Sequence, residues 1–157
     1  MIRVGSGWDL HRLVPNRPLL IGGIEIPSAK GSLAHSDGDV LIHALIDALL
    51  GALAKGDIGS HFPDTDPAYK DIDSMELLKR VVNSDLPPYS IINIDATIIL
   101  QTPKLRDHID AIRANLADAL GLAIQQVSVK AKTAEHSLAE LGSADAIAAQ
   151  VTLLISG

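Results

Sequence analysis

The segment VLIHALIDALLGAL, residues 40–53, decides the fold. Its Leu- and Ala-rich composition predicts a helix, and its apolar residues belong in a protein core. The polar loop His35-Ser36-Asp37-Gly38-Asp39 precedes the helix and consists of residue types that cap helices. We expect Ser36 or Asp37 to be the N-cap. An apolar helix of this kind has to be covered by other elements of the chain.

Several flanking segments have the patterns of β-strands. Residues 91–100 are rich in β-branched side chains, and one face of this strand is expected to carry Ile92, Ile94, Ala96, Ile98 and Leu100. Residues 127–132 alternate in the same way, and residues 151–155 favour a strand at the end of the apolar run 144–155. The short apolar runs 19–21 and 24–26 flank Gly22-Gly23 and predict a hairpin.

Two more helices are predicted. Asp73 and Glu76 have the spacing of a capping box, and a helix is expected to run from there to about Asn83. Residues 105–120 carry an apolar stripe, and Gly121 marks the C-terminal end of that helix.

The order of these elements predicts an α/β fold of the two-layer α+β kind, with a mixed β-sheet packed against about three helices. Residues 55–72 contain several glycine and proline breaks and are expected to form a long surface loop. A chain of 157 residues suits a single domain, residues 1–157, with enough core to need no covalent staple.

Composition restricts the classes of function. The chain has no cysteine, which excludes disulfides and thiolate-bound zinc, so any metal must be held by His, Asp or Glu. A net charge of −6 without a Lys/Arg run argues against a nucleic-acid partner. No apolar stretch reaches the roughly 20 residues of a bilayer span, and no apolar signal segment is visible. We expect a cytoplasmic protein that binds no membrane; a plant or algal source would imply the plastid, although no transit peptide is visible.

Asp9 and His11 are the first candidate metal ligands. In an extended backbone residues i and i+2 point to the same face, with their backbones about 7 Å apart. His43 is the candidate third ligand; alone, a histidine on an apolar helix is more often a core residue than a ligand. Two imidazoles and one carboxylate form the open three-ligand set of catalytic zinc, and Mn²⁺ or Fe²⁺ would fit the same donors. Asp39 or Asp47 is expected to accept the other ring N–H of His43.

Other groups have a functional and an ordinary interpretation. Asp57 suits a ligand hydroxyl or an ion, but it also suits a simple turn. The segment 61–67 has the composition of a mobile lid, and its aspartates are equally good turn formers. Thr133 could bind phosphate and Glu135 a hard cation, unless both stand on an exposed strand end. Lys104, with Pro103, precedes a predicted helix, where a backbone N–H and an ammonium group can meet a phosphate.

The chain resembles the 2-C-methyl-D-erythritol 2,4-cyclodiphosphate synthase family over nearly its whole length. The motifs that carry the resemblance are Gly7-Trp8-Asp9-Leu10-His11, Ile21-Gly22-Gly23, Leu33-Ala34-His35-Ser36-Asp37-Gly38-Asp39-Val40 with His43, Asp47-Ala48-Leu49-Leu50-Gly51, Gly56-Asp57-Ile58-Gly59, and Phe62-Pro63-Asp64-Thr65-Asp66-Pro67.

The resemblance implies a homotrimer with active sites at the subunit interfaces and a role for each matching residue. Zn²⁺ or Mn²⁺ is implied at Asp9, His11 and His43, and a second ion, Mg²⁺ or Mn²⁺, at Glu135 on the substrate diphosphate. Catalytic roles are implied for His35, Asp57, Thr133 and Glu135. Substrate contacts are implied for Asp9, His11, His35, Ser36, Asp57, Gly59, Phe62, Asp64 and Asp66, and, in a neighbouring subunit's cytidine-diphosphate pocket, for Leu100, Pro103, Lys104, Leu105, Arg106, Ala131, Lys132 and Thr133.

The implied reaction converts 4-diphosphocytidyl-2-C-methyl-D-erythritol 2-phosphate to the 2,4-cyclodiphosphate in isoprenoid precursor synthesis by the non-mevalonate pathway. The 2-phosphate attacks the β-phosphorus and CMP leaves, so the protein's part is positioning and charge neutralisation. A metal-dependent phosphoesterase and a non-catalytic, metal-stabilised trimer are the alternatives. The chain departs from the family pattern at Gly142-Ser143-Ala144-Asp145, where family members often carry Gly-Arg-Gly-Glu. Without that arginine, we do not expect an isoprenoid diphosphate in the trimer cavity.

Overall fold

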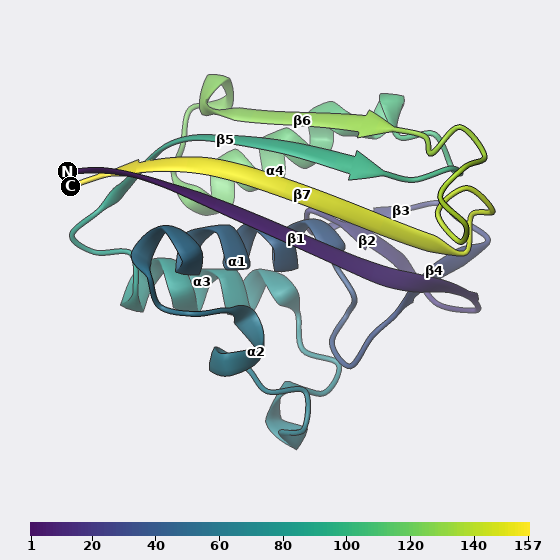
Figure 1. The fold of residues 1–157 in the computed structure, drawn as a ribbon, viewed down its shortest axis with the longest axis horizontal. Helices are drawn as coiled ribbons and strands as arrows, with labels where there is room; N and C mark the ends of the chain where they lie inside the picture. The colour runs from purple at the N-terminus through teal and green to yellow at the C-terminus, as the bar shows by residue number, and fades with distance from the viewer.

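Five strands form one mixed sheet in the computed structural model of residues 1–157 (Figure 1). They are β1 (Ile2–Pro15), β4 (Lys30–Leu33), β5 (Ser90–Ile99), β6 (Val127–Lys132) and β7 (Ala146–Ser156). Their order is β4-β1-β7-β5-β6, and only the β5–β6 pair is parallel. A separate hairpin pairs β2 (Leu19–Ile21) with β3 (Ile24–Ile26), as the glycine-interrupted apolar runs predict.

Helices cover one face of this sheet. The α-helices are α1 (Val40–Leu53), α2 (Ile58–His61), α3 (Ser74–Ser84) and α4 (Ile109–Leu120), and the 3-10 turns are η1 (Pro67–Tyr69), η2 (Arg106–His108) and η3 (Ile124–Gln126). Helix α1 packs against β1 and β7 on one side and against α3 on the other, which explains why nearly all its residues are buried. None of the helices has the length and apolar character that a membrane crossing requires.

Strand register shows which residues lie under the helices. Directly paired residues share a face of a sheet. One row across β1, β7, β5 and β6 consists of Gly7, Val151, Ala96 and Val129, and all four are buried. The adjacent row points to the opposite face, which no helix covers. On that outer face β1 exposes four apolar side chains: Ile2, Val4, Trp8 and Leu10.

Two glycines let β1 lie directly against α1. A Cβ atom at Gly5 would stand 1.9 Å from the carbonyl oxygen of Ala48, and one at Gly7 would stand 2.0 Å from that of Ala44. No side chain fits into such a gap, so glycine is required at both positions. Asp9 and His11 follow on the same face of the strand and are thereby brought to the side of α1 that carries His43.

The N-cap of α1 is Asp39, so the prediction of Ser36 or Asp37 was wrong. Asp39 accepts a hydrogen bond from the Ile42 N–H at 3.1 Å. The expected caps have other partners: Asp37 binds Ser74, and Ser36 contacts His43. The helix therefore begins after the whole polar loop rather than within it.

Other boundaries differ from the sequence-based expectation for local reasons. A bulge between Ile91 and Asn93 turns Ile91 inward and leaves Ile92 42% exposed, so Ile92 does not share the buried face with Ile94. The helix expected from residue 105 starts with η2 and becomes α-helical at Ile109. The expected 55–72 loop contains α2 and η1. Strand β7 begins at residue 146, earlier than the segment 151–155 that favours a strand.

Candidate functional site

Asp9, His11 and His43 converge on one point between β1 and α1. The Nε2 atom of His11 lies 2.9 Å from Oδ2 of Asp9, and Nδ1 of His43 lies 3.1 Å from the same oxygen. The two ring nitrogens are 3.1 Å apart. The sequence-based prediction that these three side chains meet is therefore confirmed, and their donor atoms form a group that could hold a metal ion.

The donor triangle fits a small divalent ion. Zinc binds imidazole nitrogen and carboxylate oxygen at about 2.0–2.2 Å, which in tetrahedral geometry separates neighbouring donors by about 3.3 Å. The observed separations of 2.9–3.1 Å would have to grow by only a few tenths of an ångström. The donors, two imidazoles and one carboxylate, leave a fourth position for a ligand, as in catalytic zinc sites. Without any cysteine, the same set also suits Mn²⁺.

The second ring nitrogen of His43 points away from this triangle. Its Nε2 lies 2.8 Å from Oγ of Ser74 and 3.1 Å from Oγ of Ser36. The expectation that Asp39 or Asp47 would accept this ring N–H was wrong. The carboxylate of Asp39 is occupied by backbone N–H groups, and that of Asp47 accepts from the Ile58 N–H at 2.7 Å.

Charge interactions within the cluster shift the pKa values of Asp9 and His43 in opposite directions. Burial opposes the charge of Asp9, but hydrogen bonds and attraction from His11 and His43 outweigh it and lower the Asp9 pKa from 3.8 to about 2. Burial likewise opposes protonation of His43, but the hydrogen bond to Asp9 and the charges of Asp9, Asp39 and Asp37 raise the His43 pKa above 6.5. At pH values below this raised pKa, a proton on His43 therefore competes with a metal ion for Nδ1.

We expect metal binding to release a proton at pH values below the raised pKa of His43. Protonated His43 has a raised pKa, so it stabilises the metal-free fold below pH 6.5, and this contribution is lost as the pH rises through the raised pKa. Ionised Asp9 has a lowered pKa, so its contribution is present above pH 3.8 and is lost as the pH falls through about 2. Below the raised His43 pKa, metal affinity should fall by about tenfold per pH unit.

Calorimetric titration of Zn²⁺ into metal-free protein, in buffers of different ionisation enthalpy, measures the number of protons released. A count of zero at a pH below 6.5 would contradict the raised pKa of His43.

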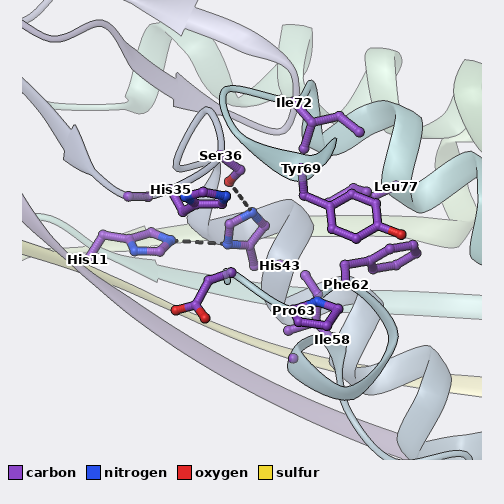
Figure 2. Close-up of a pocket in the computed structure, with 13 residues that line it drawn as sticks. His11, His35, Ser36, His43, Ile58, Phe62, Pro63, Tyr69, Ile72 and Leu77 are labelled. Atoms are coloured by element: carbon purple, nitrogen blue, oxygen red, sulfur yellow. Dashed lines mark hydrogen bonds between the residues drawn. The ribbon is translucent and has the colours of Figure 1, made fainter. Parts of the chain in front are cut away.

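A cavity of about 450 Å³ opens beside the cluster (Figure 2). Its polar side consists of His11, His35, Ser36 and His43. The opposite side comes from the 58–72 segment, where Phe62 and Tyr69 pack edge to face with ring centroids 5.4 Å apart. The full lining is His11, Ala34, His35, Ser36, His43, Ile58, Gly59, Phe62, Pro63, Asp64, Tyr69, Ile72 and Leu77. The cavity thus has one polar wall, formed beside the possible metal ligands, and one largely apolar wall.

Two of the predicted aspartates hold turns beside the cavity. Asp57 caps α2 by accepting from the Ser60 N–H at 2.8 Å and from the Ser60 hydroxyl at 2.7 Å. These hydrogen bonds lower the pKa of the exposed Asp57 carboxyl. Asp66 caps η1, and its backbone oxygen lies 3.3 Å from Nε2 of His35. Both therefore act as turn formers, whatever else they contact.

The residues expected to bind the nucleotide lie elsewhere in the chain. None of Leu100, Pro103, Lys104, Leu105, Arg106, Ala131, Lys132, Thr133 and Glu135 lines the cavity beside the metal cluster. Strand pairing places Ala131 in the same row as Asp9, with β7 and β5 between them. At the usual strand spacing the two backbones are about 14 Å apart. Pro103 lines a second cavity of about 360 Å³.

The residues expected to bind the nucleotide and the second ion differ in whether their side chains are accessible to a ligand. Leu100 and Leu105 are buried in the core, so only their backbone is available to a ligand. Thr133 and Glu135 are exposed, and the Thr133 hydroxyl donates to the Glu135 carboxylate at 3.0 Å.

Sequence reasoning gave no site role to seven residues: Ala34, Ile58, Pro63, Tyr69, Ile72, Leu77 and Ser74. Tyr69, Ile72 and Leu77 line the cavity, and Ser74 contacts the ring of His43. No local pattern indicated Ser74, which follows the helix cap Asp73 and looks like an ordinary first-turn residue. Its role depends on where α3 packs against α1, which is a tertiary feature.

The family model, the similar sequences and the similar solved structures all point to the same family of proteins. The family model described as the YgbB family matches residues 2–156. A 2-C-methyl-D-erythritol 2,4-cyclodiphosphate synthase from Thioalkalivibrio sulfidiphilus is 56% identical over 155 residues, covering 98% of this chain and 96% of the relative. A solved structure of 2C-methyl-D-erythritol-2,4-cyclodiphosphate synthase in a CDP-bound form is 36% identical, with a TM-score of 0.89 over 98% of this chain and 100% of the other. The bifunctional IspDF from Campylobacter jejuni is 42% identical, with a TM-score of 0.93 over 99% of this chain, which spans 42% of that longer protein.

Proposed function

Because the chain belongs to the YgbB family, whose curated relatives are 2-C-methyl-D-erythritol 2,4-cyclodiphosphate synthases, we propose that Asp9, His11 and His43 are the metal centre of that reaction. The protein is an enzyme of the non-mevalonate pathway. It converts 4-diphosphocytidyl-2-C-methyl-D-erythritol 2-phosphate to the 2,4-cyclodiphosphate and releases CMP. The observation that supports the metal assignment is the donor triangle with 2.9–3.1 Å edges at the mouth of the cavity.

The protein's residues act by placing two phosphates against each other. Asp9, His11 and His43 would hold a divalent ion, which would neutralise negative charge on phosphate oxygens. His35 and Ser36 face the same space and would orient phosphate oxygens through hydrogen bonds. Gly59, Phe62 and Asp64 line the other side, where the methylerythritol part would lie. No protein nucleophile is needed, since the substrate's own 2-phosphate attacks.

A second ion is proposed near Thr133 and Glu135, apart from the cavity beside Asp9, His11 and His43. Glu135 is exposed and would hold Mg²⁺ or Mn²⁺ on the diphosphate, with Thr133 beside it. Zn²⁺ or Mn²⁺ is the proposed ion at the cluster. The reaction then has positive charge at both the attacking and the leaving phosphate groups. A cytoplasmic location is proposed as well, since a cysteine-free chain fits a reducing compartment.

The active enzyme is proposed to be a homotrimer. Two features support a site shared between subunits: the expected nucleotide residues lie outside the metal-site cavity, and β1 exposes Ile2, Val4, Trp8 and Leu10 on the uncovered face of the sheet. Exposed apolar residues gathered on one face are typical of an interface. Among the solved neighbours, one synthase is a CDP-bound form and one from Plasmodium falciparum is a CDP complex.

Complementation between inactive variants tests the shared site. His43→Ala removes a metal ligand from one half, and Thr133→Ala removes a group from the other. If each site takes its halves from two adjacent subunits, mixing the two variants at a one-to-one ratio restores about a quarter of the sites. Recovery of about that size after co-refolding is the expected result. Mixtures as inactive as the separate variants would contradict a site built from two chains.

A product assay separates the cyclase from a phosphoesterase. Incubation with the substrate and Mg²⁺ should give CMP and one cyclic product. In ¹⁸O-labelled water the cyclic product should stay unlabelled, because the nucleophile is the substrate's phosphate. Release of inorganic phosphate, or ¹⁸O in the product, would instead indicate a metal-bound hydroxide as nucleophile.

A further inference from the structure

We propose that Ser74 and Asp37 are positioning residues that fix the tautomer of His43 and so present its Nδ1 lone pair to the metal ion. The inference rests on the metal centre proposed above and adds the two groups that prepare one of its ligands. Ser74 is the first residue of α3, and Asp37 lies in the loop before α1. Neither residue touches the donor triangle itself.

The contacts form a chain from the ring to a carboxylate. Nε2 of His43 lies 2.8 Å from the Ser74 hydroxyl, and that hydroxyl donates to Oδ1 of Asp37. The other Asp37 oxygen accepts the Ser74 backbone N–H at 2.9 Å. Ser74 is completely buried, so no water competes for its hydroxyl. Asp37 therefore holds Ser74 through both its backbone and its side chain.

The chemistry of Asp37, Ser74 and His43 determines which atom donates in each hydrogen bond of this series. An ionised carboxylate can only accept hydrogen bonds, so the Ser74 hydroxyl proton points to Asp37. The Ser74 oxygen is then left to accept, and its remaining close partner is the His43 ring. Ser74 consequently favours a ring proton on Nε2, which leaves the Nδ1 lone pair on the side of Asp9 and His11 for a metal ion. Metal-binding histidines commonly have their other ring nitrogen fixed in this way.

Ser36 by itself does not determine which ring nitrogen of His43 carries the proton. Its hydroxyl lies 3.1 Å from Nε2 and accepts the Gly38 N–H at 3.3 Å, but its own proton has no carboxylate partner. It could donate to Nε2 or accept from it, so it is compatible with either tautomer. The distinction between the tautomers comes from Ser74, because only Ser74 is oriented by Asp37.

Ser74→Ala tests the proposal through metal affinity. The variant should bind Zn²⁺ about 10- to 100-fold more weakly, the range typical of lost outer-shell partners. Competition with a chromophoric chelator measures this without reference to turnover. Ser74→Thr keeps a hydroxyl at the same place and should recover most of the affinity. Asp37→Asn should also weaken binding, since its amide can donate to Ser74 and free the hydroxyl to donate to Nε2.

Ser32→Ala is the matched control. Ser32 is also a buried serine, but its hydroxyl has no hydrogen-bond partner. Removing it deletes the same atoms from the interior without touching His43, so Zn²⁺ affinity should stay at the wild-type level. A Ser74→Ala variant that binds Zn²⁺ as tightly as Ser32→Ala would overturn the positioning role.

A spectroscopic readout separates positioning from simple support of the fold. In metal-free protein at alkaline pH, Asp9 at Nδ1 and Ser74 at Nε2 compete for the single proton of the His43 ring, so the ¹⁵N shifts of His43 should show a larger Nε2–H fraction in the wild type than in Ser74→Ala. An unchanged tautomer in the variant would contradict the proposal. A wild-type protein that bound no metal while still releasing CMP would overturn both the proposed metal centre and the positioning role of Ser74. A wild-type protein that binds Zn²⁺ normally, with an equally tight Ser74→Ala variant, would overturn the positioning role alone.

Discussion

His43→Ala should reduce CMP release by at least about 10²- to 10³-fold at saturating substrate, the loss seen when one strong electrostatic stabiliser is removed from an active site. His43 provides one of three donors of the triangle, and its ring also forms part of the cavity wall. With one imidazole gone, a metal ion would be held by Asp9 and His11 alone, with an extra position open to water. The initial rate of CMP formation at saturating Mg²⁺ and Zn²⁺ measures the effect.

The double variant His11→Ala/His43→Ala supplies the control. If the three side chains act as one unit, removing a second ligand should add little to the loss caused by the first. Multiplying losses would indicate that the two histidines act separately. Thermal unfolding with and without Zn²⁺ tests the non-catalytic alternative: a variant that loses its Zn²⁺-dependent rise in melting temperature but keeps full turnover would show that the metal only supports the fold.

The convergence of Asp9, His11 and His43 could be predicted because each of these residues stands out in the local sequence pattern. Asp9 and His11 need only an extended backbone to share a face, and His43 stands out as a polar group on an apolar helix. Gly5 and Gly7 then bring the strand and helix together, although their role became apparent only once Ala48 and Ala44 were seen opposite them. The strands and main helices followed from periodicity for the same reason, since burial of one face leaves a repeating pattern.

The partners of those residues could not be predicted from local pattern. Ser74 is 31 positions from His43 in the chain, and only the packing of α3 against α1 makes them neighbours. The polar loop before α1 is a second case, because its residues look alike in sequence but have different tasks. His35 and Ser36 face the cavity, Asp37 holds Ser74, and Asp39 caps the helix. Any aspartate or serine has the chemistry to cap a helix or to accept a hydrogen bond from another side chain. The tertiary contacts determine which of these roles each residue takes.

Asp39→Ala should destabilise the protein by about 3–5 kcal/mol, because it leaves the buried N–H groups of Gly22 and Ile42 without an acceptor. One oxygen of Asp39 accepts from the N–H groups of Gly22 at 2.9 Å and Ile42 at 3.1 Å, and the other accepts from that of Gly23 at 2.7 Å. Asp39 is completely buried, so water cannot replace it as the acceptor for Gly22 and Ile42, whereas the exposed Gly23 can turn to water. The melting temperature of metal-free protein should fall by roughly 10–15 °C for a chain of this size.

Asp73→Ala is the matched comparison, because it removes the same side chain from the N-cap of another helix. Asp73 is exposed and accepts only the Met75 N–H at 2.9 Å, which water can satisfy after the substitution. Its loss should therefore cost only about 1 kcal/mol, the usual value of a helix cap. The difference between the two variants isolates the second task of Asp39, which is to fasten the turn between β2 and β3 to the start of α1. Since α1 carries His43, that turn contributes to holding the proposed metal ligand in place. Equal losses for the two variants would mean that Asp39 is no more than a cap.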